Sequence, residues 1–160
     1  MKRSQINAII EDTIAFARGR GLAFPPFAYW SVEDWQNAGP ESREIVDNML
    51  GWDISDFGSG DFDKVGLAIF TFRNGSFSDK QRYPKPYAEK LLLVGDGQVL
   101  PCHFHFSKME DIINRGGGNL LIELHSSTPE GEFADSDVTV TMDGTRVTVP
   151  AGGVVTLRPG

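Results

Sequence analysis

After about residue 60, short runs of apolar and β-branched residues alternate with turn-forming residues. The clearest case is Asp143-Gly144, which separates Val-Thr-Val-Thr-Met from Thr-Arg-Val-Thr-Val. An Asp-Gly pair between two alternating runs is typical of a two-residue β-hairpin turn. No helical pattern long enough for a crossover connection lies between the runs. This part of the chain is therefore predicted to be a barrel or sandwich of short strands. Seven strands are expected, at residues 65–73, 90–94, 99–106, 120–124, 138–142, 145–149 and 154–157.

Before residue 60 the pattern is helical. Isoleucines recur at the 3.6-residue spacing of a helix as far as Ala17, and Ser4 is expected to cap this helix. Ser31 begins a capping-box pattern that predicts a short second helix. Pro40 is suited to the start of a third. A connection rich in Gly, Ser and Asp is expected over residues 53–63.

Composition narrows the functional class. Of 160 residues, 15 are Lys or Arg and 22 are Asp or Glu, which gives a net charge of −7. This balance argues against nucleic-acid binding and against binding to anionic membranes. The sequence has no apolar stretch that could span a bilayer and no secretory signal at residues 1–7. A single cysteine, Cys102, fits a reducing compartment, so we expect a cytoplasmic protein.

Two histidines alternate along the predicted strand at residues 99–106. Because residues i and i+2 of a strand share a face, His103 and His105 are expected on one face and Cys102, as a small core residue, on the other. A turn after the strand would return the Glu110 carboxylate to the histidines. Two imidazoles and a carboxylate are ligands that divalent transition metals prefer.

Simpler interpretations of the same residues stay open. Ser107 and Glu110 also have the spacing of a helix capping box, so Glu110 could cap a short turn. His103 and His105 could be exposed residues of an edge strand. The third histidine, His125, is expected to be a surface or hydrogen-bonded residue rather than a ligand.

The full spacing is Gly97-x5-His103-x-His105-x4-Glu110-x6-Gly117, and it resembles the first signature motif of the cupin superfamily at all five positions. The resemblance implies a cupin-type, jelly-roll-like β-barrel. Cupins normally take a fourth ligand from a second motif with a histidine. The segment Gly144-x5-Pro150-x-Gly152 imitates that motif, but Val155 stands where the histidine would be. It is either a degenerate motif or, as we favour, an ordinary hairpin.

Further segments resemble the D-lyxose isomerase family, a group of cupin-type sugar isomerases. They are Glu-Lys-Leu-Leu at residues 89–92, Pro-Cys-His-Phe-His at 101–105, residues 108–118 and Leu-Arg-Pro-Gly at 157–160, together with the aromatic helical segment around Phe24 to Trp30. The resemblance implies interconversion of D-lyxose with D-xylulose and of D-mannose with D-fructose. It also implies a divalent metal held by His103, His105 and Glu110. Mn²⁺ is the favoured ion, and Zn²⁺, Fe²⁺, Co²⁺ and Ni²⁺ are the alternatives. A fourth ligand is expected beyond residue 160, and a homodimer is expected by analogy with cupins.

Three other residues are candidates for contact with a sugar. Lys90 starts the strand at 90–94 and is expected to bind substrate or assist proton transfer, unless it is a solvated strand-end lysine. Glu123 lies in an apolar run and is expected to face the cavity as a base or as a partner of a ligand histidine. Lys108, between two ligands, is a candidate for substrate binding. The base could also lie beyond residue 160.

The predicted architecture is thus mainly β. A helical extension at residues 1–60 is expected to pack on a barrel at residues 61–160, and the barrel is expected to be incomplete at its C-terminus. The favoured function is a metal-dependent aldose–ketose isomerase acting through a cis-enediol. A cupin Fe²⁺ oxygenase and a non-catalytic sugar-binding cupin remain alternatives, because one scaffold carries many chemistries.

Overall fold

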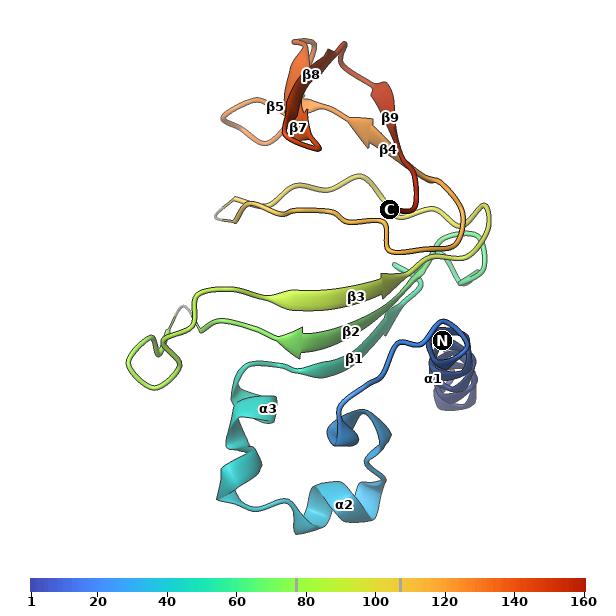
Figure 1. Ribbon diagram of the computed structural model, residues 1–160, viewed down its shortest axis with the longest axis vertical. Coiled ribbons are helices and arrows are strands. Elements are labelled where there is room, and N and C mark those ends of the chain that lie inside the picture. The colour runs from blue at the N-terminus through green and yellow to red at the C-terminus, as the bar shows by residue number, and fades with distance from the viewer. Residues whose placement is uncertain (77, 107) are drawn as a thin grey trace. The chain divides into compact units, whose positions relative to one another are not determined.

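The structure is a computed structural model that describes residues 1–76, 78–106 and 108–160. It is mainly β with an N-terminal helical segment, as predicted (Figure 1). The chain divides into two compact units, Met1–Pro101 and Cys102–Gly160. Both units carry strands, and the helices found among the described residues belong to the first unit. The domain boundary that the sequence suggests near residue 60 stays a prediction.

The helical segment begins with α1 (Arg3–Arg18), followed by the 3-10 helix η1 (Pro26–Tyr29) and by α2 (Val32–Asn37). Ser31 caps α2, since its side chain accepts a hydrogen bond from the Asp34 amide, as the capping-box pattern predicts. Ser4 was predicted to cap α1, and this is wrong. Helix α1 starts at Arg3, so the cap position lies two residues earlier than predicted and is occupied by Lys2. Pro40 begins η2 (Pro40–Ser42), which α3 (Arg43–Asp47) follows. Among the described helices, none is both long enough and apolar enough to cross a membrane.

Three antiparallel strands form the sheet of the first unit, in the order β1 (Gly51–Ser55), β2 (Leu67–Arg73) and β3 (Glu89–Leu93). The register places Trp52, Phe70 and Leu91 side by side on one face. Phe70 is fully buried there against Ala17 of α1 and Ala28 of η1, and the Trp52 indole donates a 2.8 Å hydrogen bond to the Ala28 carbonyl. One face of the sheet is therefore covered by α1 and η1.

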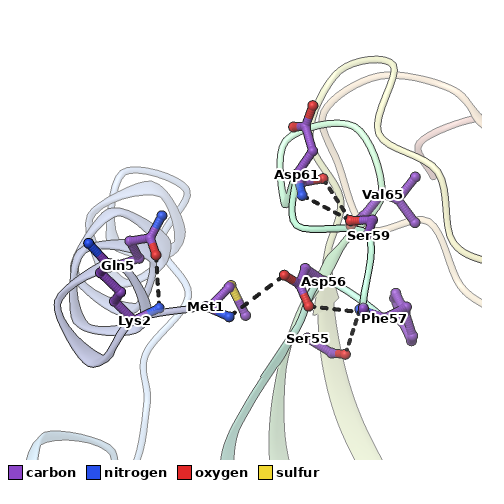
Figure 2. A network of polar contacts seen from close by, with 10 residues as sticks. Met1, Lys2, Gln5, Ser55, Asp56, Phe57, Ser59, Asp61 and Val65 are labelled. Carbon is purple, nitrogen blue, oxygen red and sulfur yellow. Dashed lines mark hydrogen bonds and ion pairs between the residues drawn. The ribbon is translucent and has the colours of Figure 1, made fainter.

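Polar contacts link the start of α1 to the turn that follows β1 (Figure 2). The amino group of Met1 lies 3.8 Å from the Asp56 carboxylate. Asp56 also accepts a hydrogen bond from the Gly58 amide, and the Ser55 hydroxyl accepts one from the Phe57 amide. These contacts hold both ends of the turn, which satisfies backbone groups that no strand pairs.

In the described part of the second unit, the strands form three two-stranded antiparallel pairs. They are β4 (Leu120–Leu124) with β9 (Gly153–Leu157), β5 (Ser126–Ser127) with β6 (Phe133–Ala134), and β7 (Val138–Met142) with β8 (Thr145–Val149). Asp143 and Gly144 both have positive φ angles, 49° and 77°, as a type I′ hairpin turn requires. Val155 is buried in β9 opposite Ile122. The hairpin predicted at Asp143-Gly144 is therefore confirmed, and the choice between an ordinary hairpin and a degenerate second motif stays a prediction.

The strand prediction is wrong in three respects. The strand expected at residues 99–106 is reduced to one isolated bridge, in which Val99 pairs with Val65. Pro101 has no amide hydrogen to donate to a ladder, which works against a continuous strand at this point. In addition, β1 occupies residues assigned to the 53–63 connection, and β5 and β6 were missed because two-residue strands carry no periodic signal.

Candidate active site

The two neighbouring histidines lie on an exposed, extended segment at the start of the second unit. Although this segment forms no strand, its side chains alternate as they would in one. The rings of His103 and His105 lie 5.1 Å apart between centroids, and those of Phe104 and Phe106 lie 4.6 Å apart. The predicted pairing of the two imidazoles on one side is therefore present without the predicted strand.

Glu110 comes back to this histidine pair, as predicted. Its Oε1 atom lies 3.4 Å from Nε2 of His105. The ammonium group of Lys108 donates a hydrogen bond to the same oxygen at 2.5 Å. The Glu110 contact therefore joins a histidine and a lysine at one carboxylate oxygen. The alternative in which Glu110 caps a turn begun by Ser107 falls on a residue outside those described.

The charge environment of Glu110 favours its ionised form. The hydrogen bond from Lys108 is the largest influence and lowers the pKa of Glu110 below its ordinary value. Partial burial opposes this effect, whereas the charges of Lys108, His105 and His103 add to it. Glu110 is thus a carboxylate at neutral pH, which is the state that a metal ligand needs.

The donor set suits a divalent metal, and the geometry fits in part. Two donors that each lie about 2.0–2.2 Å from one ion are separated by roughly 3 Å, so the 3.4 Å between His105 and Glu110 is close to a shared ligand geometry. His103 does not complete a cluster with them. In the part of the chain that the structure describes, no group of three His, Cys, Asp or Glu side chains is gathered closely enough to hold an ion.

The other candidate residues have neighbours of their own. Glu123 was predicted to face a cavity, but its side chain is 62% exposed on β4 and lies 2.7 Å from Nε2 of His125. His125 is hydrogen-bonded, as expected, and its ring packs on Phe133. Lys90 is exposed on β3 of the first unit, opposite Thr71 of β2. The roles assigned to Lys90 and Glu123 stay predictions.

The environments of Cys102 and Asn114 were not predicted correctly from the sequence pattern. Cys102 was predicted to lie in the core, but it is exposed, because its burial depended on a strand that does not form. Asn114 was not singled out. Its amide group donates hydrogen bonds to the carbonyls of Gly118 and Leu157, at 2.9 and 2.8 Å, and accepts one from the Gly116 amide. An asparagine before three glycines was the available signal for such an anchor.

The backbone conformation explains why glycine occupies two positions of the motif. Gly97 and Gly117 have φ angles of 68° and 95°, which lie in the left-handed region that side chains disfavour. Each stands at a turn that flanks the segment carrying the histidines and Glu110. The spacing that resembles the cupin motif therefore has a backbone basis at both of its ends.

Comparison with known proteins defines the functional class. Curated relatives from Serratia proteamaculans and Escherichia coli O157:H7 are 46% and 47% identical to the chain over 161 residues, and both are named D-lyxose/D-mannose isomerase. The alignments cover the whole chain and 70% of each relative. A mainly β chain with this degree of identity is a sugar isomerase.

The family follows from a second comparison. The family model described as D-lyxose isomerase matches residues 1–160. The chain belongs to the D-lyxose isomerase family.

Proposed function

We propose that the protein interconverts D-lyxose with D-xylulose, and D-mannose with D-fructose, through a cis-enediol. The names of its relatives, D-lyxose/D-mannose isomerase, support D-lyxose and D-mannose as the aldoses. We further propose that a divalent cation, most simply Mn²⁺, is held by His103, His105 and Glu110. The observation that carries this proposal is the 3.4 Å approach of His105 Nε2 to Glu110 Oε1 beside the His103 ring.

The reaction is a rearrangement within one molecule. A base takes the proton from C2 of the open-chain aldose and returns it to C1, while the proton of the C2 hydroxyl passes to the C1 oxygen. The aldose and ketose have the same atoms and electrons in total, so no oxidant or reductant is consumed. A bound divalent cation would supply Lewis acidity that makes the C–H bond next to the carbonyl more acidic.

The chain's own residues would bind the sugar and move its protons. The ammonium groups of Lys90 and Lys108 are suited to donate hydrogen bonds to sugar oxygens, which favours the developing negative charge on them. Glu123 is the candidate base among the described carboxylates, and its hydrogen bond to His125 would orient it.

The test uses purified protein stripped of metal and then supplied with D-lyxose, with Mn²⁺ present in one sample and a chelator in the other. We expect D-xylulose in the first sample alone, without oxygen uptake. In D₂O, a cis-enediol exposed to solvent would place deuterium on C1 of the ketose. Oxygen consumption would favour the Fe²⁺ oxygenase instead, and no ketose in either sample would overturn the proposed isomerisation.

A further inference from the structure

Lys108 and His105 contact the same oxygen of Glu110. The Lys108 ammonium lies 2.5 Å from Oε1, and Nε2 of His105 lies 3.4 Å from it. The ammonium is thus the closer of the two groups. It contacts the Glu110 oxygen that would bind an ion together with His105.

We propose that Lys108 is an internal counter-cation of Glu110 that a divalent metal must displace when it binds. The inference rests on the proposed function, because it takes His105 and Glu110 as metal ligands. An ammonium group in hydrogen-bond contact with Oε1 and a doubly charged ion bonded to the same oxygen would repel each other at short range. Metal binding therefore requires the Lys108–Glu110 contact to break.

Exposure and side-chain chemistry make such an exchange feasible. The Lys108 and Glu110 side chains are 38% and 41% exposed, so water screens their attraction. Lysine carries its charge on a flexible four-carbon stem and can leave one acceptor for another with little change in the backbone. An exposed contact of this kind contributes little free energy, so a divalent ion can replace it.

Release of the contact would also free the ammonium group. Once Glu110 binds the metal, the Lys108 ammonium group would be available as a charged hydrogen-bond donor in the same short segment as the ligands. This is the position from which it was proposed to bind a sugar oxygen. The exchange thus links metal loading to the availability of a substrate contact.

The test is calorimetric titration of metal-stripped protein with Mn²⁺ in the absence of sugar. We expect Lys108→Met to bind Mn²⁺ about two- to fivefold more tightly than wild type, the range that an exposed ion pair allows. Arg115→Met is the matched control, because it removes one positive charge from the same segment and Arg115 shows no ion pair among the described residues. It should leave the affinity near the wild-type value, as should Lys108→Arg.

A second measurement keeps the wild-type chain. With lysine labelled at the side-chain nitrogen, the NMR signal of Lys108 should shift during titration with diamagnetic Zn²⁺, and the shift should saturate with metal binding. An unchanged signal, or a Lys108→Met affinity equal to or below wild type, would overturn the exchange. An equal gain in Mn²⁺ affinity for Arg115→Met would also overturn the proposal, since the effect would then come from the loss of any positive charge in the segment.

Failure of the metal site itself would look different. If wild type binds no Mn²⁺, or if His105→Ala binds it as well as wild type, the ligand assignment is wrong and the Lys108 inference is overturned with it. If His105→Ala loses Mn²⁺ and Lys108→Met gains nothing, the ligands stand and only the exchange is refuted.

Discussion

The three histidines have different neighbours, and these neighbours separate their expected roles. His103 and His105 are adjacent, and His105 approaches Glu110. His125 comes later in the chain, after β4, and is hydrogen-bonded to Glu123. A ligand histidine must present a ring nitrogen to the ion, whereas a nitrogen already bonded to a carboxylate is better suited to orienting that carboxylate.

Removal of one imidazole tests this distinction. We expect His105→Ala to lose bound Mn²⁺ and isomerase activity together, because a site of so few protein ligands has no substitute for the missing donor. Metal content after gel filtration and ketose formation are the two measurements. His125→Ala is the matched control and should retain the metal. Wild-type metal content in His105→Ala would refute its assignment as a ligand.

Asp47 shows a second residue-scale effect, in the first unit. The Tyr83 hydroxyl donates a 2.9 Å hydrogen bond to Asp47, and Arg43 and Arg82 pair with the same carboxylate. The hydrogen bond from Tyr83 is the largest influence that lowers the pKa of Asp47, with the arginines adding to it. Because the folded pKa lies below the unfolded value of about 3.9, the ionised carboxylate stabilises the fold.

The sign of the pH dependence follows from that shift. The stabilisation is present above the unfolded pKa and is lost as the pH falls through the folded pKa. We expect Tyr83→Phe to raise the pKa of Asp47 and to lower the free energy of unfolding at pH 7, with the difference shrinking below about pH 4. NMR titration of the Asp47 carboxyl carbon and denaturation at both pH values would measure this. Tyr87→Phe, at an exposed tyrosine, should change neither; an unchanged Asp47 pKa in Tyr83→Phe would contradict the argument.

At the scale of elements, the loop after Glu110 depends on one side chain. Asn114 joins that loop to its own glycine turn at Gly118 and to Leu157 at the end of β9. The backbone carbonyl of Asn114 also accepts a hydrogen bond from the Gly160 amide. The segment that carries the candidate ligands is therefore fastened to the β4–β9 pair by contacts that are distant in sequence.

Asn114→Asp changes only the donor group of this anchor. The aspartate cannot donate to the two carbonyls, and its charge would face them, so we expect a loss of about 1–3 kcal/mol in the free energy of unfolding. Chemical denaturation gives this value. Asn119→Asp introduces the same charge nearby, at an exposed side chain for which no hydrogen bond is seen among the described residues, and should cost far less. Equal losses in both variants would argue that the added charge, and not the anchor, is responsible.

At the scale of the whole molecule, the aromatic core of the first unit connects the helical segment to the sheet. Phe70 of β2 is fully buried and meets Phe24 at 4.9 Å between ring centroids, against α1 and η1. Phe70→Ala should therefore lower the stability by about 3–5 kcal/mol. Phe57→Ala, at a half-exposed phenylalanine, should cost much less. Denaturant titration of both variants is the measurement, and similar costs would show that this core is not what joins the elements.

Local signals explain how much of the fold was predictable. The strands β4, β7 and β8 have the predicted bounds, since Asp143-Gly144 fixes its hairpin within a few residues. The prediction of a strand at residues 99–106 was wrong because a strand needs a partner strand, and the local sequence does not show whether one lies beside it. Cys102 was misplaced with it. The approach of Glu110 to His105 was predictable from spacing, whereas the Lys108 contact depends on the loop conformation and could not be predicted from residue types alone.

The pairing of β4 with β9 has a kinetic consequence. These strands enclose residues 125–152, and both β5–β6 and β7–β8 lie within that interval. Closing a flexible loop costs entropy that grows with the logarithm of its length, about 0.6 kcal/mol for each doubling. A hairpin with a two-residue turn forms in about 1–10 μs, and once formed it shortens the flexible path between β4 and β9. We therefore expect a nested order of assembly in the second unit, in which the inner hairpin forms before the outer pair closes around it.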